Sequence, residues 1–272
     1  MATPQTHYRS ISLPSRLHDP INPTNFEAEQ QKLKSCLSKN VAITLETIQS
    51  GLLGLAELYN SVDELQNHQD GKSIEDLIDG SDQLLDSCNT IRELVQMIRE
   101  NVQILQSALR RKGADSSIQN DINSYFCLRK KMNKCISKSL KTLKNLENKN
   151  GSNNISLSEV TIAMFKCTLV FLSLPAGKSG GWNLVSRLAW RVGFGFQGDE
   201  HKIWGCENDV INEIGNVDFA LKMRNNGVTV QMVQKRLQNA DAMVEGFEGG
   251  LDRLFRQLVQ SRVTLLNILT DN

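Results

Sequence analysis

Residues that interrupt helices are scarce in this chain. Only five of its 272 residues are proline, and four of those five lie within the first 23 positions. No proline occurs between Thr24 and Leu174. Because proline removes a backbone donor and clashes with the preceding turn, it is the strongest helix breaker. A proline-free stretch of this length predicts helices.

Clustered metal ligands are also lacking. The four histidines and six cysteines are scattered along the chain, and no two cysteines have the Cys-x-x-Cys spacing. Zinc sites in proteins take their ligands from residues at short, characteristic spacings. We therefore expect no bound metal and no cofactor, and we expect the cysteines to be reduced thiols of a cytoplasmic protein.

The chain has no long apolar run. Its N-terminus lacks the apolar core of a signal peptide, and its most apolar stretch, Val160 to Leu174, carries Lys166 near its middle. A helix that crosses a bilayer needs about 20 apolar residues. We expect no signal peptide and no membrane span, and we expect this stretch to form a core helix or at most an interfacial one.

Apolar positions recur with the period of a helix. In two segments, small or apolar residues alternate at steps of four and three, which keeps one seam facing a partner helix. The first seam is Leu77, Ser81, Leu84, Cys88, Ile91, Val95, Ile98, Val102, Leu105 and Leu109, and the second is Val233, Leu237, Ala240, Val244, Phe247, Leu251, Leu254 and Leu258. This pattern predicts an all-α, elongated antiparallel helical bundle with coiled-coil-like seams. A dimeric coiled coil is the alternative.

The same periodicity divides the chain into segments. Residues 1–25 are predicted to be a disordered polar tail, and residues 26–272 a single helical-bundle domain. Within that domain, residues 175–206 contain seven glycines and all three tryptophans, which predicts an irregular insert that packs onto the bundle. The predicted helices span 26–69, 74–112, 116–149, 156–174, 207–223 and 228–270.

Glycine and serine suggest where helices end and begin. Gly71, Gly113 and Gly151 are expected at helix C-termini, and Ser73 is expected to cap the second helix. Three further glycines lie inside the last predicted helix, which they should weaken or bend unless another backbone comes close there. They are Gly246, Gly249 and Gly250.

A short motif in the tail predicts phosphorylation. Arg9, Ser12 and Pro14 lie in the segment RSISLP, which has the Arg-Ser-x-Ser-x-Pro pattern that 14-3-3 adaptors bind when the second serine is phosphorylated. A phosphate on Ser12 would supply the charge and the acceptors that a cluster of arginines recognises. The alternative is an unmodified polar tail.

A basic segment follows in the third predicted helix. Eight lysines or arginines lie between Arg129 and Lys149, against one acid, Glu147. On a helical projection the lysines gather on one side and apolar residues on the other. This lysine face consists of Lys130, Lys131, Lys134, Lys138, Lys141 and Lys144. It predicts a surface for an anionic membrane or an acidic partner, and a solvated bundle face is the alternative. Nucleic acid is unlikely, because no base-reading module accompanies the lysines.

A glycine motif between Gly193 and Gly198 matches the dinucleotide-binding pattern G-x-G-x-x-G, and Asp218 follows at a suitable distance for a ribose. The pattern requires a strand before it and an apolar helix after it, whereas here polar residues follow. We therefore treat the match as accidental and expect no nucleotide cofactor.

Four segments resemble one known family. They are HYRSISLPSR at 7–16, KKMNKCISKSLKTLK at 130–144, GWNLVSR at 181–187 and LFRQLVQSRVTLLNIL at 254–269. Together they identify the chain as similar to the plant-specific BYPASS-related family. The resemblance implies a helical, non-enzymatic plant protein linked to root and shoot development, with no family active site to carry over.

From these observations we expect a regulatory or scaffold protein that acts through protein-protein interaction. The alternative is a peripheral membrane-associated protein that binds anionic lipid through its lysine face.

Overall fold

The computed structural model describes residues 44–65, 71–113, 115–149, 157–173, 212–224 and 229–271. Of these residues 96 % are helical and none lies in a strand. The helices are α2 (Leu45–Leu65), α3 (Gly71–Lys112), α4 (Gln119–Lys149), α5 (Leu157–Ser173), α7 (Glu213–Lys222) and α8 (Val230–Asp271), and the short 3-10 helix η1 (Ser116–Ile118) precedes α4. The predicted all-α fold is confirmed. The predicted tail at 1–25 and the insert at 175–206 lie outside the described residues.

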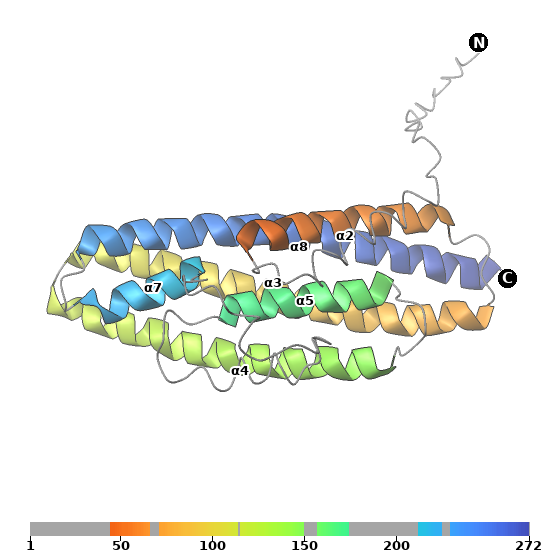
Figure 1. The fold of residues 1–272 in the computed structure, drawn as a ribbon, viewed down its shortest axis with the longest axis horizontal. Coiled ribbons are helices and arrows are strands. Elements are labelled where there is room, and N and C mark those ends of the chain that lie inside the picture. The colour runs from red at the N-terminus through yellow and green to blue at the C-terminus, as the bar shows by residue number, and fades with distance from the viewer. Residues whose placement is uncertain are drawn as a thin grey trace, which may run out of the picture.

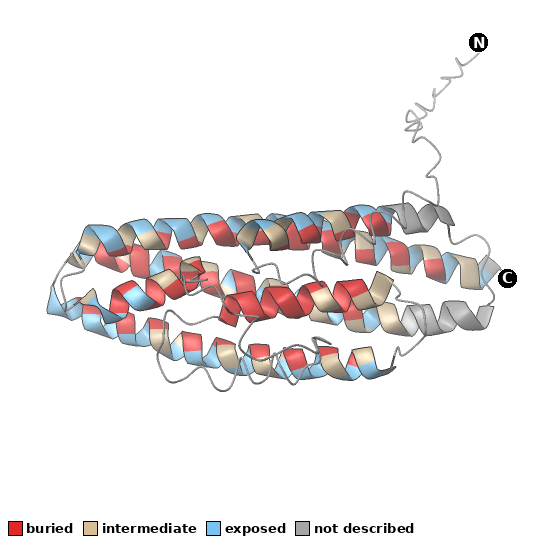
Figure 2. Ribbon diagram, in the orientation of Figure 1, coloured by how far each residue is buried: buried red, intermediate tan, exposed pale blue. Residues whose placement is uncertain are grey.

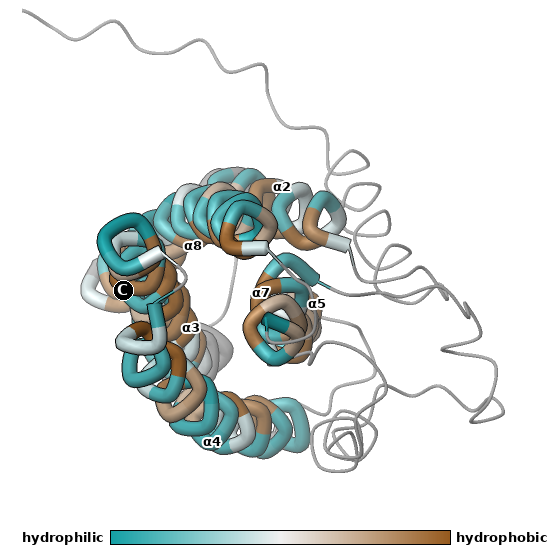
Figure 3. The backbone as a smooth tube through the Cα atoms, turned by 90° about the vertical axis from the view of Figure 1, so that its left-hand side faces the viewer, coloured by the Kyte–Doolittle hydropathy of each residue, from teal (hydrophilic) through white to brown (hydrophobic). Residues whose placement is uncertain are grey.

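The helices form an elongated bundle with an inner and an outer layer (Figure 1). Viewed along the bundle, α2, α8, α3 and α4 form a curved outer layer around α5 and α7 (Figure 3). The two inner helices follow one another along the bundle in the same direction, with α7 beginning near the end of α5 (Figure 1). Together, α5 and α7 therefore fill the interior of the bundle as two helices placed end to end.

The long helices α3 and α8 run antiparallel along the two predicted seams. Arg92 pairs with Asp252, and Arg99, further along α3, pairs with Glu248, which comes earlier in α8. Helix α2 packs beside α8 and runs in the same direction. Gly246 of α8 lies next to Gln49 of α2, and Gly250, one turn later in α8, lies next to Leu52, which also comes later in α2. Both α2 and α8 thus run opposite to α3, within the antiparallel bundle that was predicted.

The seams predicted from the sequence form the centre of the core. From Leu84 to Leu109 and from Val233 to Leu258, every seam residue is at most 3 % exposed. Buried residues face inward along each outer helix, whereas α5 is buried over most of its surface (Figure 2). The apolar run that includes Lys166 is therefore a core helix, as predicted.

Most predicted helix ends lie close to those of the structure, but the helix predicted from residue 207 begins at Glu213, after the cap Asn212. The predicted start at residue 26 and Gly151 lie outside the described residues. Gly113 adopts a φ of +58° at the end of α3, and its amide donates to the Leu109 carbonyl oxygen at 2.9 Å. This left-handed conformation suits glycine, as expected at a helix C-terminus. Gly71, in contrast, is the first residue of α3 rather than the end of the preceding helix. Ser73 consequently lies inside the first turn and is not the cap, because glycine is tolerated near a helix start as well as at its end.

Candidate functional site

Helix α4 carries the lysine face and begins at a capped turn. The carboxylate of Asp115 accepts a hydrogen bond from the Ser117 amide at 3.3 Å and so caps η1, which leads directly into α4. From there α4 continues without a break to Lys149. One continuous helix therefore presents all of the predicted lysines.

The structure places five of the six lysines in solvent. Five of them (Lys130, Lys131, Lys134, Lys138 and Lys141) are exposed, and Lys144 is half-buried. The opposite side of α4 is at most 3 % exposed over Met132, Ile136, Leu140, Leu143 and Leu146. The spacing predicted that α4 has a cationic side and an apolar side, and the structure confirms that the two lie on opposite sides of the helix.

The acids of α4 do not neutralise this face. Glu147, the single acid of the basic segment, accepts a hydrogen bond from the buried amino group of Lys166 on α5 at 2.6 Å. Asp121 pairs with Lys112 at 2.7 Å. Within the described part of the chain, the five exposed lysines have no ion-pair partner. Their charges therefore remain available to an external anion.

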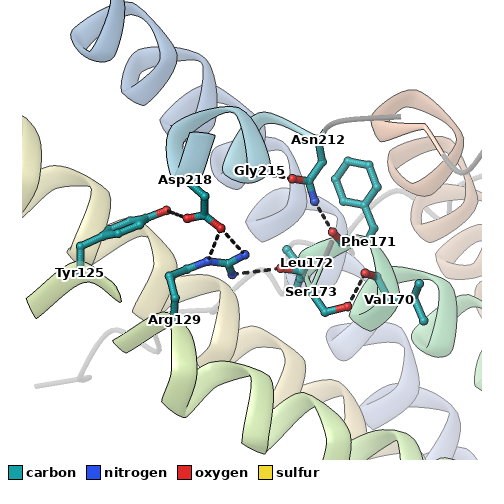
Figure 4. Close-up of polar contacts among 9 residues, drawn as sticks. All are labelled: Tyr125, Arg129, Val170, Phe171, Leu172, Ser173, Asn212, Gly215 and Asp218. Carbon is teal, nitrogen blue, oxygen red and sulfur yellow. Dashed lines mark hydrogen bonds and ion pairs between the residues drawn. The ribbon is translucent and has the colours of Figure 1, made fainter. Parts of the chain in front are cut away.

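Arg129 opens the basic segment but does not belong to the lysine face. It is 5 % exposed and points into the bundle, where its guanidinium contacts Asp218 of α7 (Figure 4). Its Nε and Nη2 donate to Asp218 Oδ2 at 3.2 and 3.1 Å, and the Tyr125 hydroxyl donates to Oδ1 at 2.7 Å. This buried cluster of Tyr125, Arg129 and Asp218 joins α4 to α7.

The same cluster closes the junction between the two inner helices. Arg129 Nη1 donates to the Leu172 carbonyl oxygen at 3.1 Å, and the side-chain amide of Asn212 donates to the Phe171 carbonyl oxygen (Figure 4). Asn212 also caps α7 by accepting a hydrogen bond from the Gly215 amide at 2.6 Å. Carbonyl groups at the end of α5, which have no partner in their own helix, are satisfied in this way.

Burial shapes the ionisation of these groups. Loss of solvent, helped by the negative charge of Asp218, raises the pKa of Tyr125 well above 10, so the phenol stays neutral and donates. Burial opposes the charge of Arg129, but Asp218 more than compensates and the pKa of Arg129 is raised. The cluster is a closed, fully hydrogen-bonded structure, and its role is to fix α7 against α4 and α5.

Asp218 therefore has a structural role rather than the ribose contact considered from the sequence. Its carboxylate is buried and engaged by Tyr125 and Arg129. The glycine motif at 193–198 lies outside the described residues. Sequence reasoning missed the cluster because nothing local marks it: Tyr125 and Arg129 lie one turn apart on α4, but their partner is about 90 positions away.

The other predictions concern the N-terminal tail, metal sites and membrane spans. Arg9, Ser12 and Pro14 lie outside the described residues, so their phosphorylation stays a prediction. In the described ranges, no three histidine, cysteine or acidic residues are grouped so that they could hold a metal ion. Nor does any helix there have the length and apolar character needed to cross a membrane.

A family model described as Protein BPS1 matches residues 44–268. That range runs from the start of α2 almost to the end of α8, and includes the lysine face and the buried cluster. No curated protein and no solved structure matches the chain.

Proposed function

Because the chain belongs to the BPS1 family, which links it to plant development, we propose that it is a non-enzymatic regulatory or scaffold protein of root and shoot development. Protein-protein interaction through the lysine face of α4 is its proposed mode of action. The proposal puts the protein in the cytoplasm, with an acidic protein surface as its partner. The family membership does not by itself identify a binding surface; the choice of the lysine face rests on the geometry of α4.

The observation that carries this proposal is the uncompensated charge of the lysine face. Like charges that lie close together on a surface repel one another unless acids stand between them. Here five exposed lysines follow one another along α4 without such a balance, while the apolar side anchors the helix in the core. A rigid row of like charges favours an anionic partner and speeds its association.

The test is to remove three of these charges and measure partner recovery from plant tissue. The Lys134/Lys138/Lys141→Gln variant should fold normally and lose most of the proteins that co-purify with the wild type. Exposed Arg110, Arg111 and Arg256 provide a matched control, since changing them to glutamine removes the same net charge elsewhere. Equal recovery by wild type and the lysine variant would contradict the proposal.

Anionic lipid is the second candidate, favoured by the same row of lysines. Each lysine near an anionic leaflet contributes about 1 kcal/mol, and the attraction falls off within a Debye length. Flotation with anionic and with neutral vesicles separates the two candidates. Binding of the wild type, but not of the lysine variant, to anionic vesicles would support lipid, whereas absence of both from the vesicle fraction would leave the protein partner.

The tail supplies a further proposed contact. The RSISLP pattern supports phosphorylation of Ser12 and capture by a 14-3-3 adaptor. Ser12→Ala, or treatment with phosphatase, should remove the adaptor from the purified complex, whereas Ser15→Ala should leave it bound. An adaptor retained by Ser12→Ala would rule out this contact.

A further inference from the structure

A cleft between α7 and α8 contains two cations that the proposed function does not use. It has a volume of about 370 Å³ and is lined by Glu213 and Asn216 of α7 and by Met232, Lys235, Arg236 and Asn239 of α8. This volume falls at the small end of the range of ligand sites. The cleft lies on a different pair of helices from the lysine face of α4.

Arg236 has no carboxylate partner in this cleft among the residues that the structure describes. Its Nη1 donates to Asn216 Oδ1 at 2.8 Å, and the Asn216 carbonyl oxygen lies 3.5 Å from the same nitrogen. Within the described part of the chain, Asn216 is its one hydrogen-bonding partner. Glu213 lines the same cleft, but among the described residues it forms no ion pair with Arg236.

Five other arginines of the bundle each form an ion pair with an acid: Arg92, Arg99, Arg129, Arg253 and Arg262. Among the described residues Arg110, Arg111 and Arg256 form no such pair, but their side chains lie in solvent. Arg236 is half-buried and held instead by a neutral amide, so its charge is fixed in place but not compensated. A partly desolvated charge without a counter-ion is unfavourable, and an external anion would remove that cost.

The chemistry of the lining narrows the class of anion. A guanidinium offers a planar set of donors that matches the oxygens of a phosphate or a carboxylate, and Lys235 adds an exposed ammonium next to it. A phosphate has enough terminal oxygens for both cations. Met232, which is 46 % exposed, supplies an apolar wall, and Asn239 adds an amide.

From these contacts we infer that the α7–α8 cleft binds a small organic phosphate monoester. Arg236 and Lys235 hold the phosphate oxygens, Asn216 positions the guanidinium, and Met232 contacts an apolar substituent. Because Glu213 also lines the cleft, a hydroxyl or amino group of the ligand would find an acceptor there. The inference does not depend on the lysine face.

Phenyl phosphate and inorganic phosphate are suitable probes, measured by titration calorimetry on the full chain at pH 7.5 and constant ionic strength. Phenyl phosphate should bind several-fold more tightly than inorganic phosphate, because its ring removes apolar surface of Met232 from water. Arg236→Gln should weaken binding about tenfold or more, since it removes charge-assisted hydrogen bonds. Asn216→Ala should weaken it less, because the guanidinium remains but is no longer oriented.

Matched variants make the result specific. Lys235→Gln changes an exposed side chain, so it should fold like the wild type and still weaken binding, whereas Arg111→Gln on α3 should have no effect. Circular dichroism checks that each variant is folded. Heat no greater than that of sodium chloride, or equal affinity in wild type and Lys235→Gln, would overturn the inference. Equal binding of phenylacetate would overturn the choice of a phosphate monoester.

Discussion

Single side chains decide how the inner helices are fixed. Arg129 and Asp218 form the bundle's buried ion pair among the described residues, with side chains 6 % and 10 % exposed. Taking two charges out of water is costly, and only good geometry with further hydrogen bonds repays it. Tyr125 and the Leu172 carbonyl oxygen supply those additional bonds. The pair therefore specifies where α7 sits more than it adds to stability.

Removing one member of this pair should be far more damaging than removing both. Asp218→Asn leaves the Arg129 charge buried without a counter-ion, and we expect it to lower the free energy of unfolding by about 3–5 kcal/mol. Urea denaturation followed by circular dichroism measures this loss.

The double variant Arg129→Met/Asp218→Leu is the control, because it replaces the pair with apolar side chains of similar size. It should be more stable than Asp218→Asn alone. If both variants lost the same stability, the uncompensated charge would not be the cause.

Two adjacent glycines of α8, Gly249 and Gly250, differ in how closely the neighbouring helix α2 approaches them. A Cβ on Gly250 would lie 3.2 Å from the Leu52 Cβ of α2, whereas a Cβ on Gly249 would meet nothing within 4 Å. Gly250 therefore lies where α2 packs closely on α8, and a side chain there would press against Leu52. Gly249 is exposed and only lowers the helix propensity of α8.

The two positions predict opposite effects of the same substitution. Gly249→Leu should raise the free energy of unfolding by about 0.5–1 kcal/mol, because leucine is a better helix former than glycine. Gly250→Leu should lower it by about 1–3 kcal/mol, because the added atoms must displace Leu52. Thermal unfolding of both variants checks the difference, and two changes of the same sign would show that α2 does not pack against α8 as described.

Helix α4 combines two functions along its length. Its apolar side and Arg129 join the core, and its lysine face, where we propose that a partner binds, lies mostly in solvent. Because the helix is held by packing on one side, binding on the other side need not disturb the fold.

For the molecule as a whole, the main feature is a continuous core. One cluster of buried apolar residues includes members from α2, α3, α4, α5, α7 and α8. Helices that share one core are expected to unfold together. A single domain over residues 26–272 stays a prediction, and its boundary at residue 26 lies outside the described residues.

Buried thiols offer a direct test of that cooperativity. Burial raises the pKa of Cys88 on α3 and of Cys167 on α5 to about 12 in each case, so neither forms a reactive thiolate near pH 8. Both should become reactive together, at the urea concentration where the helical signal is lost, while exposed Cys127 and Cys135 react throughout. Site-resolved mass spectrometry after alkylation measures this, and separate midpoints for Cys88 and Cys167 would contradict a single unfolding unit.

The raised pKa values also give these two thiols a pH-dependent contribution to stability. In the unfolded chain these thiols ionise near pH 9, whereas in the folded chain they stay protonated to about pH 12. Their contribution is therefore fully present below pH 9 and is lost as the pH rises toward 12.

The helices, their seams and the two sides of α4 were predictable from the sequence. Each is a periodic property of one segment, and an α-helix converts spacing along the chain into direction in space. The seam residues from Leu84 to Leu109, and the exposed lysines from Lys130 to Lys141, lie where that conversion puts them. The predicted start of α3, at residue 74, was three residues too late, because glycine and serine occur on both sides of a helix boundary.

Only the tertiary structure decided which helices meet and what their polar side chains contact. Arg129 belongs by spacing to the basic segment, yet packing turns it inward to Asp218; Arg236 resembles the other arginines, yet it faces an amide. Such contacts join residues far apart in the chain, so their geometry depends on how whole helices pack and not on the period of any one of them. For this reason the sequence determined the helices and which of their sides are apolar or charged. Packing determined the buried cluster of Tyr125, Arg129 and Asp218, and the α7–α8 cleft.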